Sequence, residues 1–452
     1  MKKILAIILA LCLIAAFTAC SSGESSQPSS SSGGNAPSSS SEATPSADPD
    51  SLEPEEGAEI EICYWLNNEP EGQAWQDLFD SYSQETGVKV LGTEYVSGST
   101  YRDKLDTRIA AGDYPDVARY TYQRMGKFKE AELMLDITDY SPEENYSDLV
   151  DAYYYGMMYN GRLIGMPHHT DTIGIFYNVS MFEESGIKAP TSPAEAWSWD
   201  EFNEIAAKLK ADHNLEYAFA GIWEGGSGYR FLPFVYMNGG AVLNEAQDSI
   251  TFASDETLAA LELYSYWREN DLVTKNGFTQ ESMCNEMFVT GRIAMAFAGS
   301  WQCDYMEQNM PGNWNITYMP QVDGKSGSDM GGNGLFAFAN TEYPNASACL
   351  IRHITEKDNM KAFCEATNFI PVRQSLLDEG LTYSAYQEQM DVLLEIVGTL
   401  DPKMTADETS TRFQQLNTIF TEAMDYIAID NSKTAQEVMD EVQAGMDEVL
   451  AE

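Results

Sequence analysis

Basic residues are scarce in this sequence. Its 452 residues include 26 Lys and Arg against 71 Asp and Glu, which gives a formal net charge of -45. Such a chain repels nucleic acid and anionic lipid headgroups, so we exclude binding to a phosphate backbone. Solubility alone also explains acidity of this degree, and the charge therefore names no function by itself.

Histidine and cysteine are few as well. With four His and no Cys-x-x-Cys pair, the sequence supports neither a thiol-ligated zinc site nor a receptor for zinc or manganese, and it points to no cofactor. Of seven Cys, Cys12 and Cys20 lie near the start of the chain. The other five are too widely spaced for a disulfide framework, and at least one must be unpaired. They are Cys63, Cys284, Cys303, Cys349 and Cys364.

The sequence has one long apolar run and no second one of membrane-spanning length. Lys2 and Lys3 precede the run at 4–17, which is too short for a comfortable transmembrane helix and is typical of a signal peptide over residues 1–19. The segment 17–20 (FTAC) resembles the bacterial lipobox, although Phe17 stands where Leu is usual. That resemblance implies a lipid such as palmitate on Cys20. An ordinary signal peptide with an incidental Cys is the alternative.

Large apolar residues are almost absent from the next segment, residues 20–58, which is rich in Ser, Gly and Pro. It cannot bury enough surface to offset the entropy of ordering, so we expect a disordered tether. A flexible chain of this length reaches roughly 35 Å, enough to hold a folded body away from a lipid surface. Its attachment through Cys20 would place that body on the outer face of a cell membrane.

The remaining chain is longer than one hydrophobic core usually serves, which favours two lobes. Strand and helix patterns alternate over its first part in a β-α-β-α-β order, which predicts parallel strands and an α/β fold. The predicted strands begin near Ile60, Val88 and Pro115. Ligands bind beyond the carboxyl ends of such strands. This rule selects Trp65, Asn67, Asn68, Arg119 and Tyr120 as candidate binding residues.

Further elements follow along the chain. The segment 173–178 predicts a strand, and Ser198 with Glu201 forms a capping box that opens a helix. An apolar strand at 293–297 leads into 299–301, and an amphipathic helix ends the sequence. No repeat of fixed period is present, which argues against solenoids and propellers.

Several short motifs resemble the extracellular solute-binding proteins of ABC importers, in the group similar to maltose-binding protein. They are the segments 114–117 (YPDV), 161–167 (GRLIGMP), 176–178 (FYN), 199–202 (WDEF), 287–295 (MFVTGRIAM) and 299–301 (GSW). The resemblance covers nearly all of the chain after the tether, and the order of the motifs makes it specific. It implies a two-lobed periplasmic-binding-protein-like fold of type II, with a central cleft and hinge crossings.

The resemblance also implies where the lobes divide. Lobe one would hold residues 59–174 and 320–376, and lobe two residues 175–319 and 377–452. The crossings would lie near Ile175, Tyr318 and Leu376.

A sugar site needs flat aromatic faces for stacking and planar polar side chains for paired hydroxyl groups. Trp223 lies in a Gly-rich loop without helical or strand periodicity, which favours the cleft over the core. Trp301 follows a strand and Gly-Ser, where the edge of the cleft and the core are equally good interpretations. Trp65, at the end of a strand, has the same two interpretations. Other Trp residues at helical spacing are assigned to the core.

Polar candidates complete the predicted site, each with a plain structural alternative. Asp171 precedes the first crossing, where the family often places ligand contacts, but it could serve as a turn or cap residue. Gly332 and Asn333 could offer backbone N–H groups or form a turn; their segment lacks the context and the Lys of a phosphate loop. Arg373 resembles the cleft segment of the family or forms a surface ion pair. Weaker candidates are Arg230 and Asn238.

His168 and His169 suggest a metal site, but neighbouring residues in a strand point to opposite faces, so at most one could enter a common site. We therefore expect no metal site.

The resulting hypothesis is a receptor without catalytic activity. It would capture a small solute, a sugar or oligosaccharide, close its lobes and dock as a monomer on an ABC permease at the surface of a Gram-positive bacterium. One alternative is a surface-anchored carbohydrate-active hydrolase, although no carboxylate pair can be named. Another is a receptor for a peptide or a metal.

Overall fold

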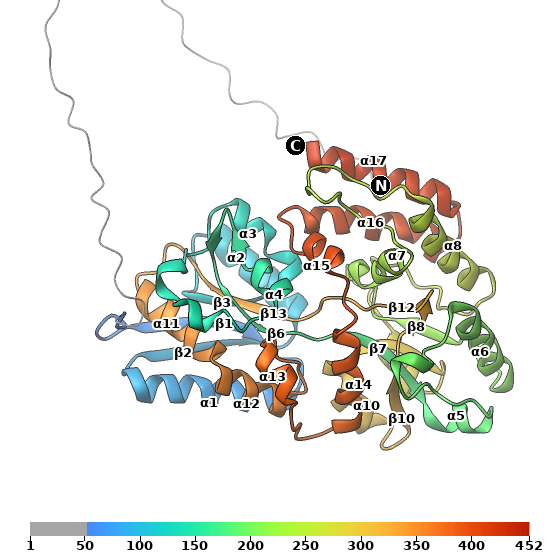
Figure 1. The fold of residues 1–452 in the computed structure, drawn as a ribbon, viewed down its shortest axis with the longest axis horizontal. Helices are drawn as coiled ribbons and strands as arrows, with labels where there is room; N and C mark the ends of the chain where they lie inside the picture. Colours follow the sequence, from blue (N-terminus) through green and yellow to red (C-terminus); the bar gives the residue numbers. More distant parts are fainter. Residues whose placement is uncertain (1–51, 452) are drawn as a thin grey trace, which may run out of the picture. The chain divides into compact units, whose positions relative to one another are not determined.

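The computed structural model describes residues 52–451, whose helices and strands are shown in Figure 1. The predicted signal peptide, Cys20 and most of the predicted tether lie outside the described residues. Within the described range, no helix combines the length and apolarity that a membrane span requires.

Five strands form the first sheet, in the order β2-β1-β3-β13-β6. Strands β1, β2 and β3 are parallel, which confirms the β-α-β-α-β prediction, and β13 lies antiparallel between β3 and β6. The bounds are β1 Glu59–Trp65, β2 Lys89–Tyr95, β3 Val117–Thr121, β6 Met166–His169 and β13 Asn333–Ala337.

Local signals set the first helix of this sheet. The Asn68 side chain accepts the backbone N–H of Glu71 and begins α1, and Gly87 ends α1 in the left-handed region at φ 77°. Figure 1 shows α1 and α12 on one side of the sheet and α2 and α3 on the other. The helices of this part are α1 Glu69–Thr86, α2 Gly98–Ala110, α3 Gly126–Glu130, α4 Asp151–Gly156, α11 Pro344–Thr355, α12 Lys357–Thr367 and α13 Gln374–Glu379.

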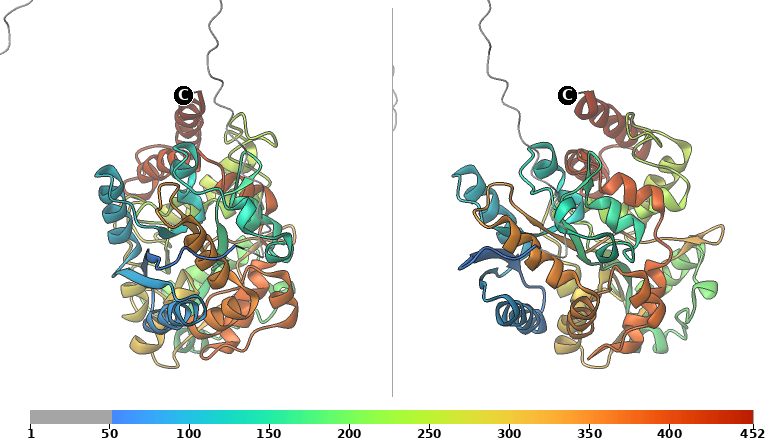
Figure 2. Two further views of the ribbon diagram at one scale, coloured as in Figure 1. Left: turned by 90° about the vertical axis from the view of Figure 1, so that its left-hand side faces the viewer. Right: turned by 60° about the vertical axis from the view of Figure 1, so that its left-hand side comes forward.

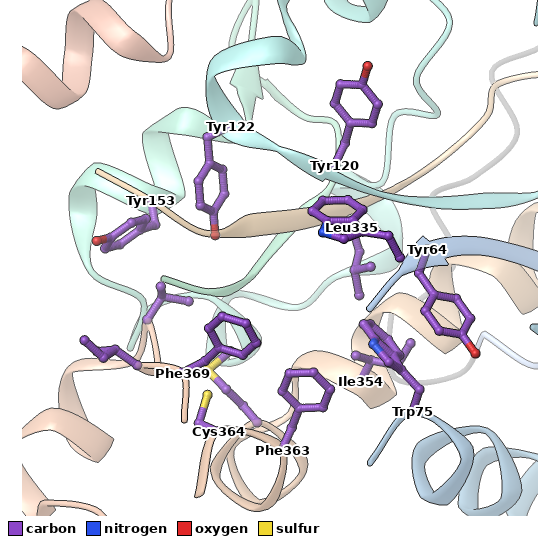
Figure 3. Close-up of a cluster of buried hydrophobic side chains, with 14 of the residues drawn as sticks. Tyr64, Trp75, Tyr120, Tyr122, Tyr153, Leu335, Ile354, Phe363, Cys364 and Phe369 are labelled. Carbon is purple, nitrogen blue, oxygen red and sulfur yellow. The ribbon is translucent and has the colours of Figure 1, made fainter. Parts of the chain in front are cut away.

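Aromatic side chains fill the core around this sheet. Figure 3 shows Phe363 and Trp75 together on the face opposite Tyr120, and the Trp75 and Phe363 rings lie 5.1 Å apart. Cys364, drawn in the same figure, is fully buried there. The five cysteines of the described residues are all buried and free, so no disulfide stabilises this part of the chain.

Four strands form the second sheet, in the order β10-β7-β9-β8. Strand β7 is antiparallel to β9 and β10, and β8 is parallel to β9. The bounds are β7 Ile173–Asn178, β8 Phe219–Gly221, β9 Met295–Gly299 and β10 Trp314–Thr317. The helices of this part are α5 Val179–Glu184, α6 Trp199–Asp212, α7 Pro233–Met237, α8 Asp255–Glu269, α9 Cys284–Val289, α10 Cys303–Asn309, α14 Gln387–Val397, α15 Pro402–Glu408, α16 Phe413–Ala428 and α17 Ala435–Ala451. The predicted capping box of Ser198 and Glu201 is confirmed at the start of α6.

We call the first sheet with its helices the first lobe, and the second sheet with its helices the second lobe (Figures 1 and 2). The chain passes from β6 in the first lobe to β7 in the second within four residues, and it returns between β10 and β13. Helix α14 packs on β10 and β7, so the chain enters the second lobe again after α13. The predicted lobe boundaries themselves stay predictions. Two small hairpins, β4 Met158–Tyr159 with β5 Arg162–Leu163 and β11 Gln321–Val322 with β12 Lys325–Ser326, complete the strands.

Candidate functional site

Buried polar side chains from both lobes meet next to the chain crossings. Arg230, in the 3-10 helix η6 (Gly228–Phe231), lies with its Nε 3.2 Å from Oδ2 of Asp329, and the Asp329 side chain is fully buried. Asp171 follows β6 and is also buried. Gly331 approaches Asp171 so closely that a Cβ on it would lie 1.9 Å from Oδ1. Only glycine therefore fits at this position.

Two more side chains complete this group. Nε2 of Gln123, in the 3-10 helix η2 (Tyr122–Arg124), donates a hydrogen bond of 2.9 Å to Oε2 of Glu408 and another to the carbonyl oxygen of Met330. Glu408 ends α15 and is fully buried. We call these five residues the central polar cluster: Gln123, Asp171, Arg230, Asp329 and Glu408.

Aromatic rings flank the only cation of this cluster. The guanidinium carbon of Arg230 lies 4.7 Å from the centre of the Tyr229 ring and 4.9 Å from that of Trp301. A Cβ on Gly299 would meet the Trp301 ring at 1.8 Å, so this glycine leaves the space in which the indole lies. Both rings are oriented by cation–π contact with Arg230.

Several oxygens of the cluster have no hydrogen-bond partner among the described residues. They are Asp171 Oδ1 and Glu408 Oε1, while Asp329 Oδ2 has only its ion pair with Arg230. A buried polar atom without a partner costs about 1–3 kcal/mol, so such atoms mark places where a ligand group or water is needed. Carboxyl oxygens beside aromatic rings suit a ligand with many hydroxyl groups.

Burial shifts the acidity of these carboxyl groups. It raises the pKa of Asp171 to about 7, against the charge of Arg230, while the neighbouring charge of Asp329 adds to the increase. Burial also raises the pKa of Asp329 and brings that of Glu408 well above its usual range. One guanidinium therefore faces three carboxyl groups whose pKa values are all raised by burial.

This arrangement predicts a pH-dependent stability. Because the pKa of Asp171 is higher in the folded than in the unfolded chain, its contribution is present at low pH and is lost as the pH rises through about 7. We expect the free energy of unfolding to fall less steeply from about pH 5 to about pH 8 in Asp171→Asn than in the unsubstituted protein. Urea unfolding at several pH values measures this. Asp323→Asn, an exposed residue, is the control, and equal slopes for Asp171→Asn and the unsubstituted protein would contradict the prediction.

A second polar group lies inside the first lobe. Arg119 is fully buried; it donates to the carbonyl oxygen of Trp65 at 2.7 Å and pairs with Glu71 at 3.1 Å, and its Nη2 lies 2.9 Å from Nε2 of His169. Its guanidinium lies 4.5 Å from the centre of the Trp65 ring. Asn333 lies 3.3 Å from His169 in the same group. Most of these polar groups therefore already have partners within the protein.

The positions of Arg119 and Tyr120 differ from the prediction that they follow the strand. Strand β3 continues to Thr121, so both residues lie inside it and their side chains lie on opposite faces. Tyr120 packs against Phe128 with ring centres 5.0 Å apart, away from the Arg119 group.

The other predicted residues have local structural roles. Asn67 bonds to Glu71, and Asn68 caps α1 and donates to the carbonyl oxygen of Thr367. Asn238 donates to the carbonyl oxygen of Phe234 at the end of α7. Gly332 has φ 89° and lies tightly against β6, where a Cβ would be 2.2 Å from the carbonyl oxygen of His169. Arg373 is buried; it donates to the carbonyl oxygens of Thr355 and Asn145 and also forms an ion pair with the partly exposed Asp148 at 3.7 Å, as its structural alternative predicted.

Trp223 lies in the core of the second lobe instead of facing the cleft. It is 1% exposed, and its ring centre lies 5.4 Å from that of Phe297 and 6.0 Å from that of Phe231. The structure thus brings Asp171, Arg230 and Trp301 together, and it places the remaining predicted residues in the first-lobe group or in local contacts. Ligand contact remains a prediction for all of them.

The two histidines do not follow the predicted alternation. Gly334 pairs with Pro167 and Asn333 pairs with His169, so His168 is the extra residue of a β-bulge. Both imidazole rings consequently lie near Phe363, at 4.4 Å and 6.0 Å. Burial, with the charge of Arg119, lowers the pKa of both well below the usual range, so both rings are neutral. Among the described residues no group of three His, Cys, Asp or Glu could hold a metal ion.

Sequence reasoning missed Gln123, Tyr229, Asp329 and Glu408. Tyr229 adjoins Arg230, which offered a weak signal. Glu408 and Gln123 are 285 residues apart, and no local pattern indicates that they meet.

Side chains close over the central polar cluster in this structure. Two pockets, of about 290 and 360 Å³, open near the lobe junction, but neither is lined by Asp171, Arg230 or Trp301. The Arg230 side chain is 13% exposed. A ligand can therefore reach the cluster only if the lobes or the intervening side chains move.

Comparisons with known proteins agree with this architecture. The chain is 23% identical over 314 residues to a binding protein of Brucella abortus, covering 67% of this chain and 73% of that protein. It is 23% identical over 263 residues to the sn-glycerol-3-phosphate-binding periplasmic protein UgpB of Escherichia coli, covering 56% and 57% of the two chains.

A solved structure shares the fold. The GacH receptor of Streptomyces glaucescens, determined unliganded and with acarbose, superposes with a TM-score of 0.73 at 18% identity, covering 88% of this chain and 99% of that one. The predicted two-lobed fold of type II is thereby confirmed. The family model described as bacterial extracellular solute-binding protein matches residues 77–390. The chain therefore belongs to the bacterial extracellular solute-binding proteins.

Proposed function

We propose that this protein captures a sugar or oligosaccharide between its two lobes and delivers it to an ABC permease. The observation that carries the proposal is the central polar cluster, in which buried carboxyl oxygens without partners lie beside the Trp301 and Tyr229 rings. Sugars present hydroxyl donors and apolar C–H patches, which match these two kinds of group. Acarbose, which is bound in a GacH structure, and the glycerol phosphate named for UgpB are both hydroxyl-rich solutes.

The proposal includes attachment to a membrane. The start of the sequence resembles a lipoprotein signal, so we place the mature protein as a lipid-anchored monomer on the outer face of the cell membrane of a Gram-positive bacterium. The lipid on Cys20 would keep the receptor near its permease. If Cys20 carries the lipid, Cys20→Ala releases the protein into the medium.

The test of solute binding is calorimetry with a panel of neutral mono- and oligosaccharides, together with chromatography of each sugar after incubation. Heat of binding with the sugar recovered intact is the expected result, because no bond is broken. Turnover of the sugar at catalytic protein concentrations would contradict a receptor.

Trp301→Ala is expected to weaken binding of the sugar at least tenfold, because the variant removes the aromatic face beside Arg230. The indole is partly exposed, so the melting temperature should change little. Tyr266→Ala removes an aromatic ring that is 45% exposed on α8 and serves as the matched control. Equal affinities of Trp301→Ala and Tyr266→Ala would exclude Trp301 from the site.

A further inference from the structure

Two arginines next to the central polar cluster have no acidic partner. Arg102 on α2 and Arg124 on η2 form no ion pair with any described Asp or Glu, although acidic residues outnumber basic ones 71 to 26 in the chain. Arg108, six residues further along α2 than Arg102, pairs with both Glu61 and Asp113. In so acidic a protein, two arginines without carboxylates are unexpected.

Arg124 is a charge neighbour of Arg102 at the lobe junction. Arg124 donates from Nη2 to the carbonyl oxygen of Gly226 in the second lobe at 3.1 Å. Arg102 extends from the first lobe, where its Nη1 would lie 3.2 Å from a Cβ on Gly98, beside the Trp65 indole. Tyr229, which contacts Arg230, is a charge neighbour of both arginines. The pair therefore adjoins the aromatic side of the central polar cluster.

Like charges in a partly buried place repel each other and lose hydration. Burial and then the charge of Arg124 lower the pKa of Arg102, while the adjacent Asp103 is exposed and opposes this effect more weakly. Both side chains are only half-buried. The free-energy cost of their repulsion and lost hydration is therefore small enough for the protein to fold without a ligand. An anion placed between them would remove the repulsion and accept several charge-assisted hydrogen bonds.

We propose that the solute is an acidic saccharide, whose carboxylate or phosphate group binds between Arg102 and Arg124. This inference rests on the proposed function and specifies its substrate class. Arg230, the one cation of the central polar cluster, already pairs with Asp329, so the acidic group lies at the arginine pair and the hydroxyl-bearing ring lies toward Trp301. The opposite ends of the site thus fix the orientation of the solute.

The experiment compares matched sugars. Calorimetry is run with neutral disaccharides, with the same disaccharides carrying a uronic acid, with sugar phosphates, and with inorganic phosphate alone. We expect at least one acidic form to bind tenfold or more tightly than its neutral counterpart, with an affinity that falls as salt is added. A preference for the uronic acid or for the phosphate distinguishes the two sources of the charge.

Variants locate the acidic group. Arg102→Gln and Arg124→Gln should each weaken binding of the acidic sugar at least tenfold and that of the neutral sugar less than threefold. Arg292→Gln is the matched control, because Arg292 is 53% exposed and lies 3.9 Å from Glu216. It should leave both affinities unchanged.

The outcomes separate the two proposals. If neutral sugars bind as tightly as acidic ones, or if both arginine variants bind the acidic sugar like Arg292→Gln, the acidic-saccharide inference is overturned and sugar capture stands. The inference is also overturned if inorganic phosphate binds but no saccharide does. If no saccharide of either kind binds, sugar capture itself fails, and the inference fails with it.

Discussion

Replacing Trp223 by alanine is expected to lower the free energy of unfolding by about 3–5 kcal/mol, the range for large-to-small changes at a buried Trp. The ring is 1% exposed and packs among the aromatic residues of the second lobe, and Gly221 leaves room for it, since a Cβ there would lie 2.2 Å from the indole. Its removal therefore leaves a cavity that the neighbouring strand cannot readily fill. Urea unfolding measures the loss.

Two further measurements make this prediction specific. Tyr266→Ala should change the free energy of unfolding by less than about 0.5 kcal/mol, because its ring is substantially exposed. Sugar affinity of the folded Trp223→Ala protein should remain within about threefold of the unsubstituted protein. A large loss of affinity with unchanged stability would instead return Trp223 to the binding site.

Gly126→Ala is expected to weaken sugar binding roughly tenfold to hundredfold, because it prevents the two lobes from meeting as they do here. A Cβ on Gly126, at the start of α3, would lie 1.9 Å from the carbonyl oxygen of Thr411 and 2.6 Å from its carbonyl carbon. The obstacle is backbone, so no side-chain rotation relieves it. Small-angle scattering with saturating sugar should show a less compact protein than the unsubstituted one.

The control for this substitution is Gly72→Ala in α1, where the added Cβ would meet only Leu66 Cδ1 at 3.5 Å. It should leave affinity and compaction unchanged. If Gly126→Ala binds sugar and compacts like Gly72→Ala, the contact between α3 and Thr411 is not needed for sugar binding.

The first lobe could be predicted from the sequence where its signals are local. The alternation at 60–65, the helix stopped by Gly87 and the following strand are each encoded within a few residues, and the structure contains them as β1, α1 and β2. The capping box at Ser198 is local in the same way. The motifs that resemble solute-binding proteins supplied the two-lobed fold, which no local pattern could have specified.

The candidate site could be predicted only in part, since its residues come from distant segments. Asp171, Arg230 and Trp301 were identified, but their partners Asp329 and Glu408 were not, because their pairing depends on how the lobes pack. Trp223 was misplaced for a related reason: its loop has no periodicity, and the rings that bury it come from elsewhere in the second lobe. Burial of a loop residue is a tertiary property.

Strand β13 has a consequence for how the molecule assembles. It lies between β3 and β6, yet it is made after the whole second sheet, and Tyr122 bonds to Asn333 across 211 residues of chain. The first sheet thus cannot be completed until almost three quarters of the polypeptide has emerged from the ribosome. Closing so long a loop delays folding. We expect the nascent chain to stay unfolded for an extended period while it is being synthesised.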